Sequence, residues 1–395
     1  MSHLPPSIDD RVIWDMWESQ FRLPACTVAD ELGLFRAVSD AGLTTGELAA
    51  QLSLDPHALS ILLAALASSG LLEKREGRWR ALPPARTWLH PDGEGYWGGF
   101  LVGYRERNPL HGQLLEAMRT GKRPERFNSG APEWERGEMS AEAAARIAWF
   151  MHAHSMAPAR GAAVQSVFGE VSHLMDVGCG SGVYGIEIAK AHPRLEVTLL
   201  DLSAMAGEAE NYIERAGVRG RVGTSACNMF TEGWPAGPDA HFFANVFHDW
   251  SVETNKLLAR KSFEALPSGG RIFLSEILMD DDGTGPWHAA AFSLLMLIGT
   301  LGKQYSLPEF RDILESAGFT DVQAVRTGGG YYSLVSAASL SAGKIPSSSA
   351  TVHAGSRNCD SHMSQITRSS LVGGRWPGIG VSVFFGLDTR AARQG

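Results

Sequence analysis

A short glycine-rich run is the pattern in this chain that most directly suggests chemistry. Asp176 opens the run Asp-Val-Gly-Cys-Gly-Ser-Gly, which follows a strand-like stretch and precedes a helix starting near Val183. Gly178, Gly180 and Gly182 let the backbone approach a ligand closely, because glycine has no β-carbon and tolerates positive φ. The free N–H groups at the start of the helix would face the same ligand. The run therefore predicts a site for a nucleotide-like molecule.

An acid at the end of the next predicted strand narrows the choice of ligand. Asp201 lies nineteen residues after Gly182, where a carboxylate can accept hydrogen bonds from ribose hydroxyls. Enzymes that bind nicotinamide dinucleotides also have an acid at this place that binds ribose hydroxyls, but their loop has the sequence G-x-G-x-x-G rather than the G-x-G-x-G found here. Asp176 adds a carboxylate that suits an ammonium-bearing ligand. We therefore expect S-adenosyl-L-methionine as the cofactor; a tight turn that binds nothing is the alternative.

A histidine and a carboxylate are expected at the same edge of the sheet. His248 follows the strand candidate 240–244, and Glu276 follows the next candidate, 271–274. A phenol with a pKa of about 10 is a poor nucleophile until it loses its proton, and histidine titrates in the useful range. A carboxylate on the other ring nitrogen would fix the tautomer. We predict that His248 is a general base supported by Glu276 or Asp249; a histidine that only caps a loop is the alternative.

The elements that must position these residues alternate between strand and helix from residue 171 onward. This alternation predicts an α/β fold with a doubly wound, mostly parallel sheet, and ligands bind beyond the carboxyl ends of such strands. We assign the catalytic domain to residues 166–339. The strand candidates are 174–177, 197–200, 240–244, 271–274 and 329–336, and the helix candidates are 183–191, 205–216, 253–265 and 307–317.

The first hundred residues have a different pattern. Thr44 and Glu47 form a plausible capping box, Asp55 and Pro56 start a second helix, and a hairpin follows around a Glu-Gly turn at 76–77. Helices followed by such a hairpin predict a mainly α winged-helix domain over 1–100. Residues 101–165 are expected to be connecting helices that contribute to a substrate pocket. The Ser, Gly and Arg-rich stretch 340–395 is expected to be a disordered tail.

Several ordered motifs resemble the class I small-molecule O-methyltransferases of the plant caffeate and bacterial natural-product type. The resemblance covers roughly residues 15–338. Its marks are the winged-helix N-terminus, the glycine run, Asn228-Met229-Phe230, Asn245-Val246-Phe247-His248-Asp249-Trp250, Ser275-Glu276 and Ser316-Ala317-Gly318-Phe319. The resemblance implies a Rossmann-like methyltransferase domain, a winged-helix domain used for homodimerisation, and a histidine base.

The same resemblance assigns further cofactor-binding residues. Met229 is expected against adenine and Ser155 near the methionine end of the cofactor, and the remaining candidates are Leu202, Asn228, Phe230 and Asn245. Asn228 replaces the aspartate common in the family, which leaves an amide oxygen as acceptor. A second acid often found near the following helix is replaced by Leu307 or Pro308, with Glu309 close by.

Apolar side chains on two predicted helices suit a flat substrate. Trp149 and Met151 lie on the helix before the sheet, and Phe292 and Met296 lie on an apolar helix near 289–300. Methionine and aromatic faces can line a pocket for such a molecule, although core packing gives the same stripe. We expect a small aromatic natural product as substrate. We expect no metal, because no cluster of His, Asp and Glu has ligand spacing.

Composition limits the alternatives. The chain has 395 residues, 44% hydrophobic and 20% charged, with a net charge of -8, which argues against a nucleic-acid partner. The four cysteines show no paired spacing along the chain, which favours a reducing, cytoplasmic location. The N-terminus lacks a signal-peptide pattern, and the richest apolar stretch is about a dozen residues long, so we expect no membrane span.

Two other functions fit part of the pattern. Proteins of the same fold methylate nitrogen or carbon, or use the cofactor for other chemistry; the pair His248 and Glu276 favours oxygen. A winged-helix regulator with an effector domain would need a basic recognition helix. Helix 55–69 has no Lys or Arg, and residues 1–100 hold thirteen acidic against eight basic side chains. Only the wing residues Lys74, Arg75, Arg78 and Arg80 favour the regulator.

Overall fold

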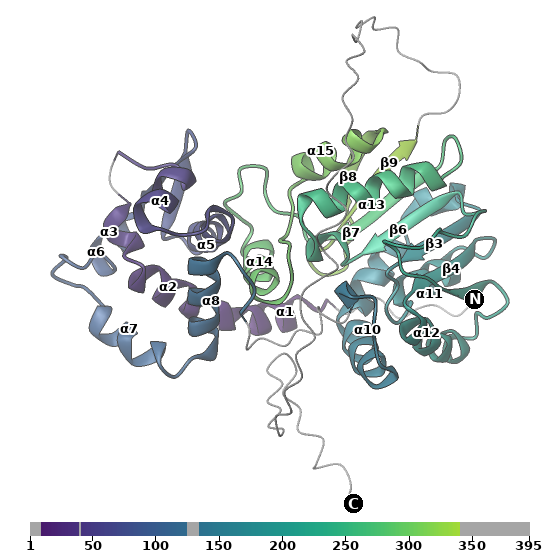
Figure 1. The fold of residues 1–395 in the computed structure, drawn as a ribbon, viewed down its shortest axis with the longest axis horizontal. Coiled ribbons are helices and arrows are strands. Elements are labelled where there is room, and N and C mark those ends of the chain that lie inside the picture. Colours follow the sequence, from purple (N-terminus) through teal and green to yellow (C-terminus); the bar gives the residue numbers. More distant parts are fainter. Residues whose placement is uncertain (1–8, 39–40, 125–133, 340–395) are drawn as a thin grey trace, which may run out of the picture.

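The computed structural model describes residues 9–38, 41–124 and 134–339, and the segment 340–395 predicted as a disordered tail lies outside them. A mostly helical N-terminal part lies beside a C-terminal part that is built on a seven-stranded sheet with helices on both faces (Figure 1). The N-terminal helices are α1 (Arg11–Glu18), η1 (Ser19–Phe21), α2 (Arg22–Glu31), α3 (Leu34–Ala37), α4 (Thr45–Leu52), α5 (Pro56–Ser68), α6 (Pro83–Trp88), α7 (Gly98–Arg105) and α8 (Pro109–Thr120).

The predicted winged-helix pattern is confirmed in its local details. The Thr44 hydroxyl accepts a hydrogen bond from the Glu47 backbone N–H, and the Glu47 carboxylate accepts one from the Thr44 N–H, so the capping box is complete. Asp55 caps α5 by accepting from the Ala58 N–H at 2.8 Å. The wing is the antiparallel pair β1 (Leu72–Arg75) and β2 (Arg78–Ala81).

The C-terminal sheet is doubly wound, as predicted. The strand order is β5-β4-β3-β6-β7-β9-β8; the first five strands are parallel, and β9 runs antiparallel to both neighbours. The strands are β3 (His173–Val177), β4 (Glu196–Asp201), β5 (Val222–Ala226), β6 (Ala240–Ala244), β7 (Arg271–Glu276), β8 (Phe319–Arg326) and β9 (Ser333–Ser339). The chain order reverses between β3 and β6, which is where ligands bind in such sheets.

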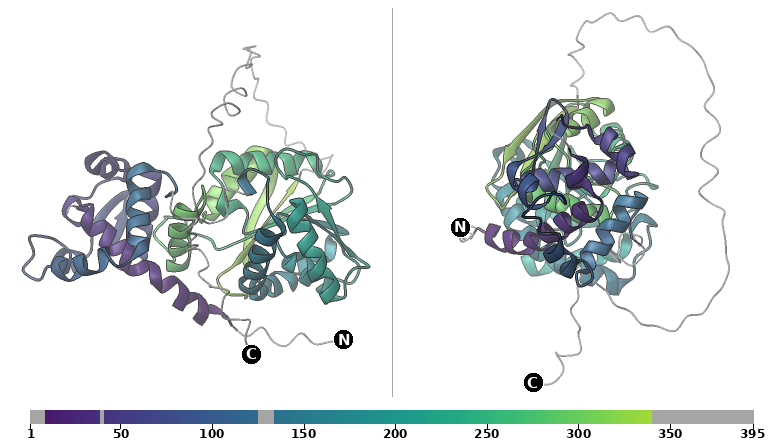
Figure 2. Two further views of the ribbon diagram at one scale, coloured as in Figure 1. Left: turned by 60° about the horizontal axis from the view of Figure 1, so that its bottom comes forward. Right: turned by 90° about the vertical axis from the view of Figure 1, so that its left-hand side faces the viewer.

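Helices cover both faces of this sheet. The helices of the C-terminal part are α10 (Ala141–Ala163), η2 (Ser166–Glu170), α11 (Val183–Ala191), α12 (Ser203–Ala216), η3 (Phe247–Asp249), α13 (Val252–Ala265), α14 (Trp287–Gly299) and α15 (Leu307–Ala317). Helix α14 is the exception, because it leaves the sheet and packs against α1, α5 and α8 of the N-terminal part (Figures 1 and 2). One apolar core joins these four helices, so α14 holds the two parts of the chain together.

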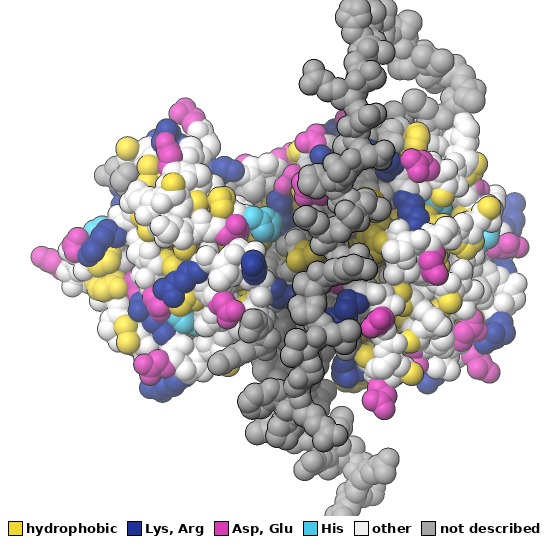
Figure 3. All heavy atoms as spheres, viewed as in Figure 1, with side chains coloured by type: hydrophobic (Ala, Val, Ile, Leu, Met, Phe, Trp, Pro, Cys, Tyr) yellow, Lys and Arg dark blue, Asp and Glu magenta, His cyan; other side chains and the backbone are white. Residues whose placement is uncertain are grey.

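The packing of α14 also bears on the regulator hypothesis. Eight residues of α5 are buried, and α14 covers this helix, so α5 cannot enter a DNA groove with an exposed face. In the wing, Lys74 donates to the Asp282 carbonyl, Arg75 pairs with Glu73, and Arg78 pairs with Glu47. Figure 3 shows basic and acidic side chains interspersed over the visible face of this part.

Within the described ranges, no single helix is both long and apolar enough to cross a membrane. Helices α4 and α5 reach that length only as a pair, and the chain bends by 113° between them.

Candidate active site

Two adjoining cavities lie at the carboxyl edge of the parallel strands. The glycine-loop cavity is lined by Trp134, Met139, Ile147, Met151, Gly178, Gly180, Leu200, Asp201, Leu202, Met205, Cys227, Asn228, Met229, Phe230, Ala244, Asn245, Val246, Asp249 and Trp250. The aromatic cavity has a volume of about 440 Å³ and is lined by Asp10, Ile13, Trp14, Trp17, Trp134, Phe150, Met151, Ala153, His154, Asn245, His248, Asp249, Phe292, Leu295, Met296 and Thr300. They share Trp134, Met151, Asn245 and Asp249, so a molecule in one cavity can touch a molecule in the other.

The three glycines of the loop have different roles. All three have positive φ, between 55° and 73°. A β-carbon on Gly182 would lie 2.3 Å from Leu199 Cδ1, whereas one on Gly180 would have no atom within 4 Å. Gly182 therefore lets α11 pack closely on β4, and Gly180 borders open space. Of the three glycines, Gly178 and Gly180 line the cavity and Gly182 does not.

Asp201 is held at the cavity wall by the loop itself. Its Oδ2 accepts a hydrogen bond from the Gly180 N–H at 2.9 Å, and its Oδ1 accepts one from the Leu202 N–H at 2.7 Å. Burial raises the pKa of Asp201 to about 6. Each carboxylate oxygen can accept a second hydrogen bond, so the residue can bind a pair of neighbouring hydroxyls.

Two residues predicted to bind the cofactor lie behind the cavity wall. The Asp176 carboxylate is 1% exposed and accepts a hydrogen bond from the Gly185 N–H at 3.1 Å, so it stabilises the first turn of α11. Ser155 is also buried, and its hydroxyl lies 3.1 Å from His154 Nδ1. Neither residue lines either cavity. The structure therefore does not place Asp176 or Ser155 against a ligand.

The segment after β5 contributes Asn228, Met229 and Phe230 to the wall, as expected. The Asn228 Oδ1 accepts hydrogen bonds from the Phe230 and Thr231 N–H groups. The amide oxygen expected to replace a family aspartate is thus engaged in the local turn, which sequence alone does not reveal.

Asn245 stands between the two cavities at the end of β6. Its backbone has a φ of 55°, a conformation that is unfavourable for residues other than glycine. Its Oδ1 accepts a hydrogen bond from the Tyr332 hydroxyl at 2.9 Å, while its buried Nδ2 has no hydrogen-bond partner among the described residues. Because Asn245 lines both cavities, it stands where two bound molecules would meet.

The predicted substrate residues divide into two groups. Met151, Phe292 and Met296 line the aromatic cavity, but Trp149 does not, and its side chain is 60% exposed. Successive residues of a helix point about 100° apart, and the phase of α10 turns Phe150 rather than Trp149 toward the cavity. His154, one turn further on, also lines this cavity, and burial lowers its pKa to about 4.

The pair His248 and Glu276 forms as predicted. Glu276 is fully buried; its Oε1 accepts from the Val246 and Phe247 N–H groups, and its Oε2 lies 2.9 Å from His248 Nδ1. The Gln304 side-chain amide also reaches this nitrogen, with Nε2 at 3.0 Å. A β-carbon on Gly302 would lie 2.2 Å from the His248 carbonyl oxygen, so the glycine lets the 300–305 segment bring Gln304 to the ring.

The Glu276 charge makes the His248 ring easier to protonate than a buried histidine without a charged neighbour would be. Burial lowers the pKa of His248, but the neighbouring Glu276 charge raises it, and the net direction is upward. Asp249 Oδ1 lies 3.7 Å from His248 Nε2, and burial raises the pKa of Asp249 to about 7. Glu309, which lies close in sequence to the position of the family's second acid, caps α15 and pairs with Lys303.

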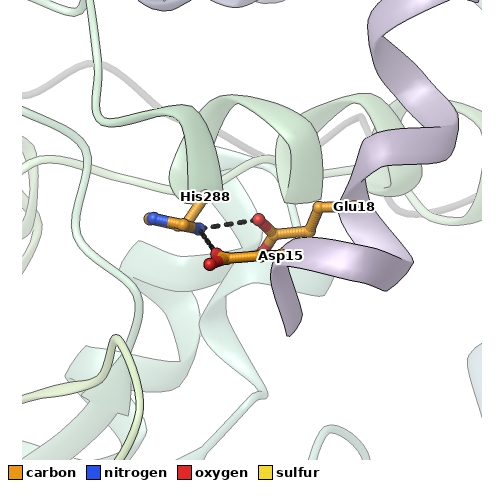
Figure 4. A group of neighbouring side chains, drawn as sticks. All are labelled: Asp15, Glu18 and His288. Atoms are coloured by element: carbon orange, nitrogen blue, oxygen red, sulfur yellow. Dashed lines mark hydrogen bonds and ion pairs between the residues drawn. The ribbon is translucent and has the colours of Figure 1, made fainter. Parts of the chain in front are cut away.

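Helix α1, which lines the aromatic cavity, is fastened to α14 by a polar cluster (Figure 4). His288 Nδ1 lies 2.7 Å from Glu18 Oε2 and 3.6 Å from Asp15 Oδ1. The Tyr331 hydroxyl donates to Asp15 at 2.6 Å, and its ring stacks on His288. Within the described ranges this is the one group of three potential metal ligands, and its members come from distant parts of the chain, which is why spacing along the sequence did not reveal it.

Comparisons with known proteins agree with this arrangement. Residues 111–320 match the model of an O-methyltransferase domain, and residues 19–91 match an O-methyltransferase dimerisation domain. The chain is 33% identical to a 3-hydroxy-5-methyl-1-naphthoate 3-O-methyltransferase of Streptomyces sahachiroi, over 79% of this chain and 88% of the relative. It is 30% identical to an L-tyrosine C(3)-methyltransferase of Streptomyces lavendulae, over 74% and 81%.

Solved structures share the fold. An O-methyltransferase family 2 protein from Planctomyces limnophilus, crystallised with apigenin, is similar with a TM-score of 0.75 and 24% identity, over 86% of this chain and 98% of that one. Other similar structures contain S-adenosylmethionine or S-adenosylhomocysteine. Together with the glycine loop, Asp201 and the family match, these findings show that the chain belongs to the S-adenosylmethionine-dependent O-methyltransferase family.

Proposed function

We propose that the protein transfers a methyl group to a hydroxyl of a small aromatic natural product held in the aromatic cavity, with His248 as the general base. The observation that carries the proposal is the position of His248: it lines this cavity, and its Nδ1 is 2.9 Å from the buried Glu276 carboxylate. The arrangement leaves Nε2 to take a proton from an acceptor hydroxyl. As the proton moves, the Glu276 charge stabilises the imidazolium that forms.

The residues of the glycine-loop cavity fit S-adenosylmethionine. Asp201 has acceptor capacity for the two ribose hydroxyls, and Leu202 and Met229 supply apolar surface for an adenine ring. Asn245 lines both cavities and would lie between the cofactor and the acceptor. The cofactor supplies an activated methyl group on a sulfonium centre. The protein's task is then to hold the acceptor oxygen in line with that methyl and to remove its proton.

The apolar lining supports an aromatic acceptor. Trp14, Trp17, Phe150 and Phe292 surround the cavity, and their flat faces suit a ring system. The named relatives act on a naphthoate and on tyrosine, both aromatic. Because the second of these methylates carbon, transfer to a carbon ortho to a hydroxyl is the alternative. The same base would serve there, since losing the hydroxyl proton also activates the ring carbon.

Replacing His248 with Ala tests the base. For an unactivated phenol such as 2-naphthol, we expect turnover to fall by roughly 10²–10⁴, the usual contribution of a general base. A nitro-substituted phenol that is already ionised at the assay pH should lose much less, because it needs no base. An equal loss for both acceptors would show that His248 acts only through packing.

We also propose a homodimer formed through the N-terminal part. The match to a dimerisation domain over residues 19–91 supports it. An apolar group next to that segment gives a physical reason. Phe100 contacts Trp97 edge-on and Tyr104 at a tilt, while these three residues are 42–57% exposed. Light scattering should give twice the mass of one chain, and a monomeric mass would contradict the proposal.

A further inference from the structure

A second histidine lines the aromatic cavity. His154 lies on α10 and is partly exposed, and its Nδ1 lies 3.1 Å from the Ser155 hydroxyl oxygen. Its other ring nitrogen, Nε2, makes no hydrogen bond within the described ranges, and it is not among their fully buried atoms that lack a partner. The proposed reaction gives this ring no task. A ring nitrogen without a partner at the wall of a mostly apolar cavity is available to a bound molecule.

The neighbouring serine indicates which nitrogen of His154 carries the proton. Ser155 is buried, and His154 Nδ1 is the one side-chain partner of its hydroxyl in the described part of the chain. A buried hydroxyl needs an acceptor for its proton, and Nδ1 is the acceptor within reach. When Nδ1 accepts, the proton of a neutral imidazole is on Nε2. His154 therefore presents an N–H donor to the cavity.

The environment of His154 differs from that of the base. His248 has the Glu276 carboxylate 2.9 Å from its Nδ1, whereas the neighbour of His154 Nδ1 is an uncharged hydroxyl. Burial lowers the pKa of His154 to about 4, so the ring is neutral at pH 7 and is a weak base. Titratable groups whose environments push their pKa values apart take different roles. His154 is therefore a neutral hydrogen-bond donor and not a second base.

Two aromatic rings connect the two histidines along the cavity wall. The Trp14 ring lies 5.6 Å from the His154 ring and 5.8 Å from the Phe292 ring, centroid to centroid. Phe292 in turn lies 5.2 Å from the His248 ring. All four residues line the cavity, and Phe150 packs edge-on against His154, which restrains the direction of its ring. A flat molecule against Trp14 and Phe292 can therefore reach His248 with one group and His154 with another.

A carbonyl oxygen is the group that matches this neutral donor. It accepts hydrogen bonds and donates none, and it enters an apolar cavity without the cost of desolvating a charge. We propose that His154 is a specificity-determining residue, whose Nε2–H donates a hydrogen bond to a carbonyl oxygen of the aromatic acceptor while the hydroxyl to be methylated faces His248. The acceptor class is then hydroxylated aromatic ketones or quinones. This inference rests on the proposed function, because it takes the aromatic cavity as the acceptor site.

Calorimetric binding to the protein saturated with S-adenosylhomocysteine separates this contact from chemistry. The probes are 6-acetyl-2-naphthol and 7-acetyl-2-naphthol, each paired with the isopropenyl compound in which a CH2 group replaces the carbonyl oxygen at the same shape. In the wild type we expect at least one ketone to bind about 3-fold or more tightly than its isopropenyl counterpart, as one hydrogen bond between neutral groups predicts.

His154→Phe keeps an aromatic ring and removes the donor. We expect this variant to bind the ketone and its isopropenyl counterpart equally, because only the ketone loses a hydrogen bond. An effect of the acetyl group on the acidity of the naphthol would act at His248 and would persist in the variant. His154→Leu, which also lacks a donor and fills less space, should abolish the preference in the same way. Thermal unfolding checks that the variants fold.

Trp149→Phe is the control, because it changes an aromatic residue of the same helix whose side chain lies outside both cavities. We expect it to keep the preference of the wild type. The proposal is overturned if the wild type prefers neither ketone, if either His154 variant keeps the preference, or if the variants weaken both members of a pair equally.

Failure of the proposed function would give a different result. In that case the wild type would methylate none of the naphthols on addition of S-adenosylmethionine, while the preference for a ketone and its loss in His154→Phe could still be measured. The binding assay thus tests His154, and the transfer assay tests the reaction.

Discussion

Replacing Glu276 with Gln removes the charge that faces His248 while it keeps the shape of the side chain. The carboxylate is fully buried, and its Oε2 lies 2.9 Å from His248 Nδ1. If His248 takes the acceptor proton, a positive charge develops on the ring in the transition state, and Glu276 is the charge that offsets it. The variant therefore tests how much the Glu276 charge contributes to the base, and not only whether the His248 ring is needed.

The expected loss follows from the distance. With an effective dielectric constant of about 20, two unit charges at this separation attract by about 6 kcal/mol. This is an upper limit, because the new amide still has an acceptor oxygen and Gln304 also contacts the ring. We expect about half to two-thirds of it, about 3–4 kcal/mol, which corresponds to a fall of roughly 10²–10³ in kcat.

The pH dependence should change in a defined direction. Burial lowers the pKa of His248 and the Glu276 charge raises it, with the net direction upward. The neutral ring is the base, so wild-type kcat/KM should rise with pH as the ring loses its proton. Without the Glu276 charge, burial still lowers the pKa of His248 and only the smaller effect of the Asp249 charge opposes it, so in the variant this rise should move to lower pH.

Methylation of 2-naphthol followed between pH 5 and pH 9 gives both quantities. Glu315→Gln, the same change at an exposed position of α15, is the control and should behave as wild type. A variant that keeps its rate within a few-fold and its pH profile unmoved would refute the assignment of Glu276 as the partner of the base.

Two further predictions concern the glycine-loop cavity. Asp201→Ala should weaken binding of S-adenosylmethionine at least about 10-fold in calorimetry, as expected for hydrogen bonds to a charged group. Because the pKa of Asp201 is about 6 and the ionised form is the better acceptor, wild-type affinity should fall as pH drops below that value; an affinity as pH-dependent in the variant would exclude Asp201 as the cause. Gly182→Ala should lower the free energy of unfolding by about 1–3 kcal/mol or more, because a β-carbon would meet Leu199 at 2.3 Å and φ is +73°. Gly207→Ala on α12, where a β-carbon meets nothing within 4 Å, is its control in denaturant titration, and equal effects of the two changes would contradict the close-packing role.

Most of the sheet could be predicted because its central strands are buried on both faces. Strands β3, β4, β6 and β7 are continuous apolar runs, and the structure confirms them with shifts of a residue or two at the ends. Strands β5 and β8 were missed. They are the two edge strands, the sequence of β5 is Val-Gly-Thr-Ser-Ala, and much of β8 is exposed and irregular in register, so neither has a clear apolar pattern.

The site was predictable where neighbouring strands bring their ends together. His248 and Glu276 follow β6 and end β7, which are hydrogen-bonded neighbours, so their approach follows from the order of the sheet. Gln304, His154 and Asp10 reach the same region from a loop and from two helices outside the sheet. Their positions depend on tertiary packing, for which no local motif exists. The outward direction of the Trp149 side chain depends on the phase of α10, and the inward direction of Asp176 depends on its hydrogen bond from the Gly185 N–H. No local motif predicts either direction.

The central claim is that the protein methylates a hydroxyl of an aromatic molecule, and isotopic transfer tests it most directly. The wild type is incubated with S-adenosylmethionine that carries a trideuterated methyl group and with naphthalene-2,7-diol, and the product is analysed by mass spectrometry and NMR. We predict one trideuteromethyl group bonded to oxygen, formed far more slowly by His248→Ala. A label on carbon, or no labelled product from this or any other aromatic acceptor tested, would contradict the account.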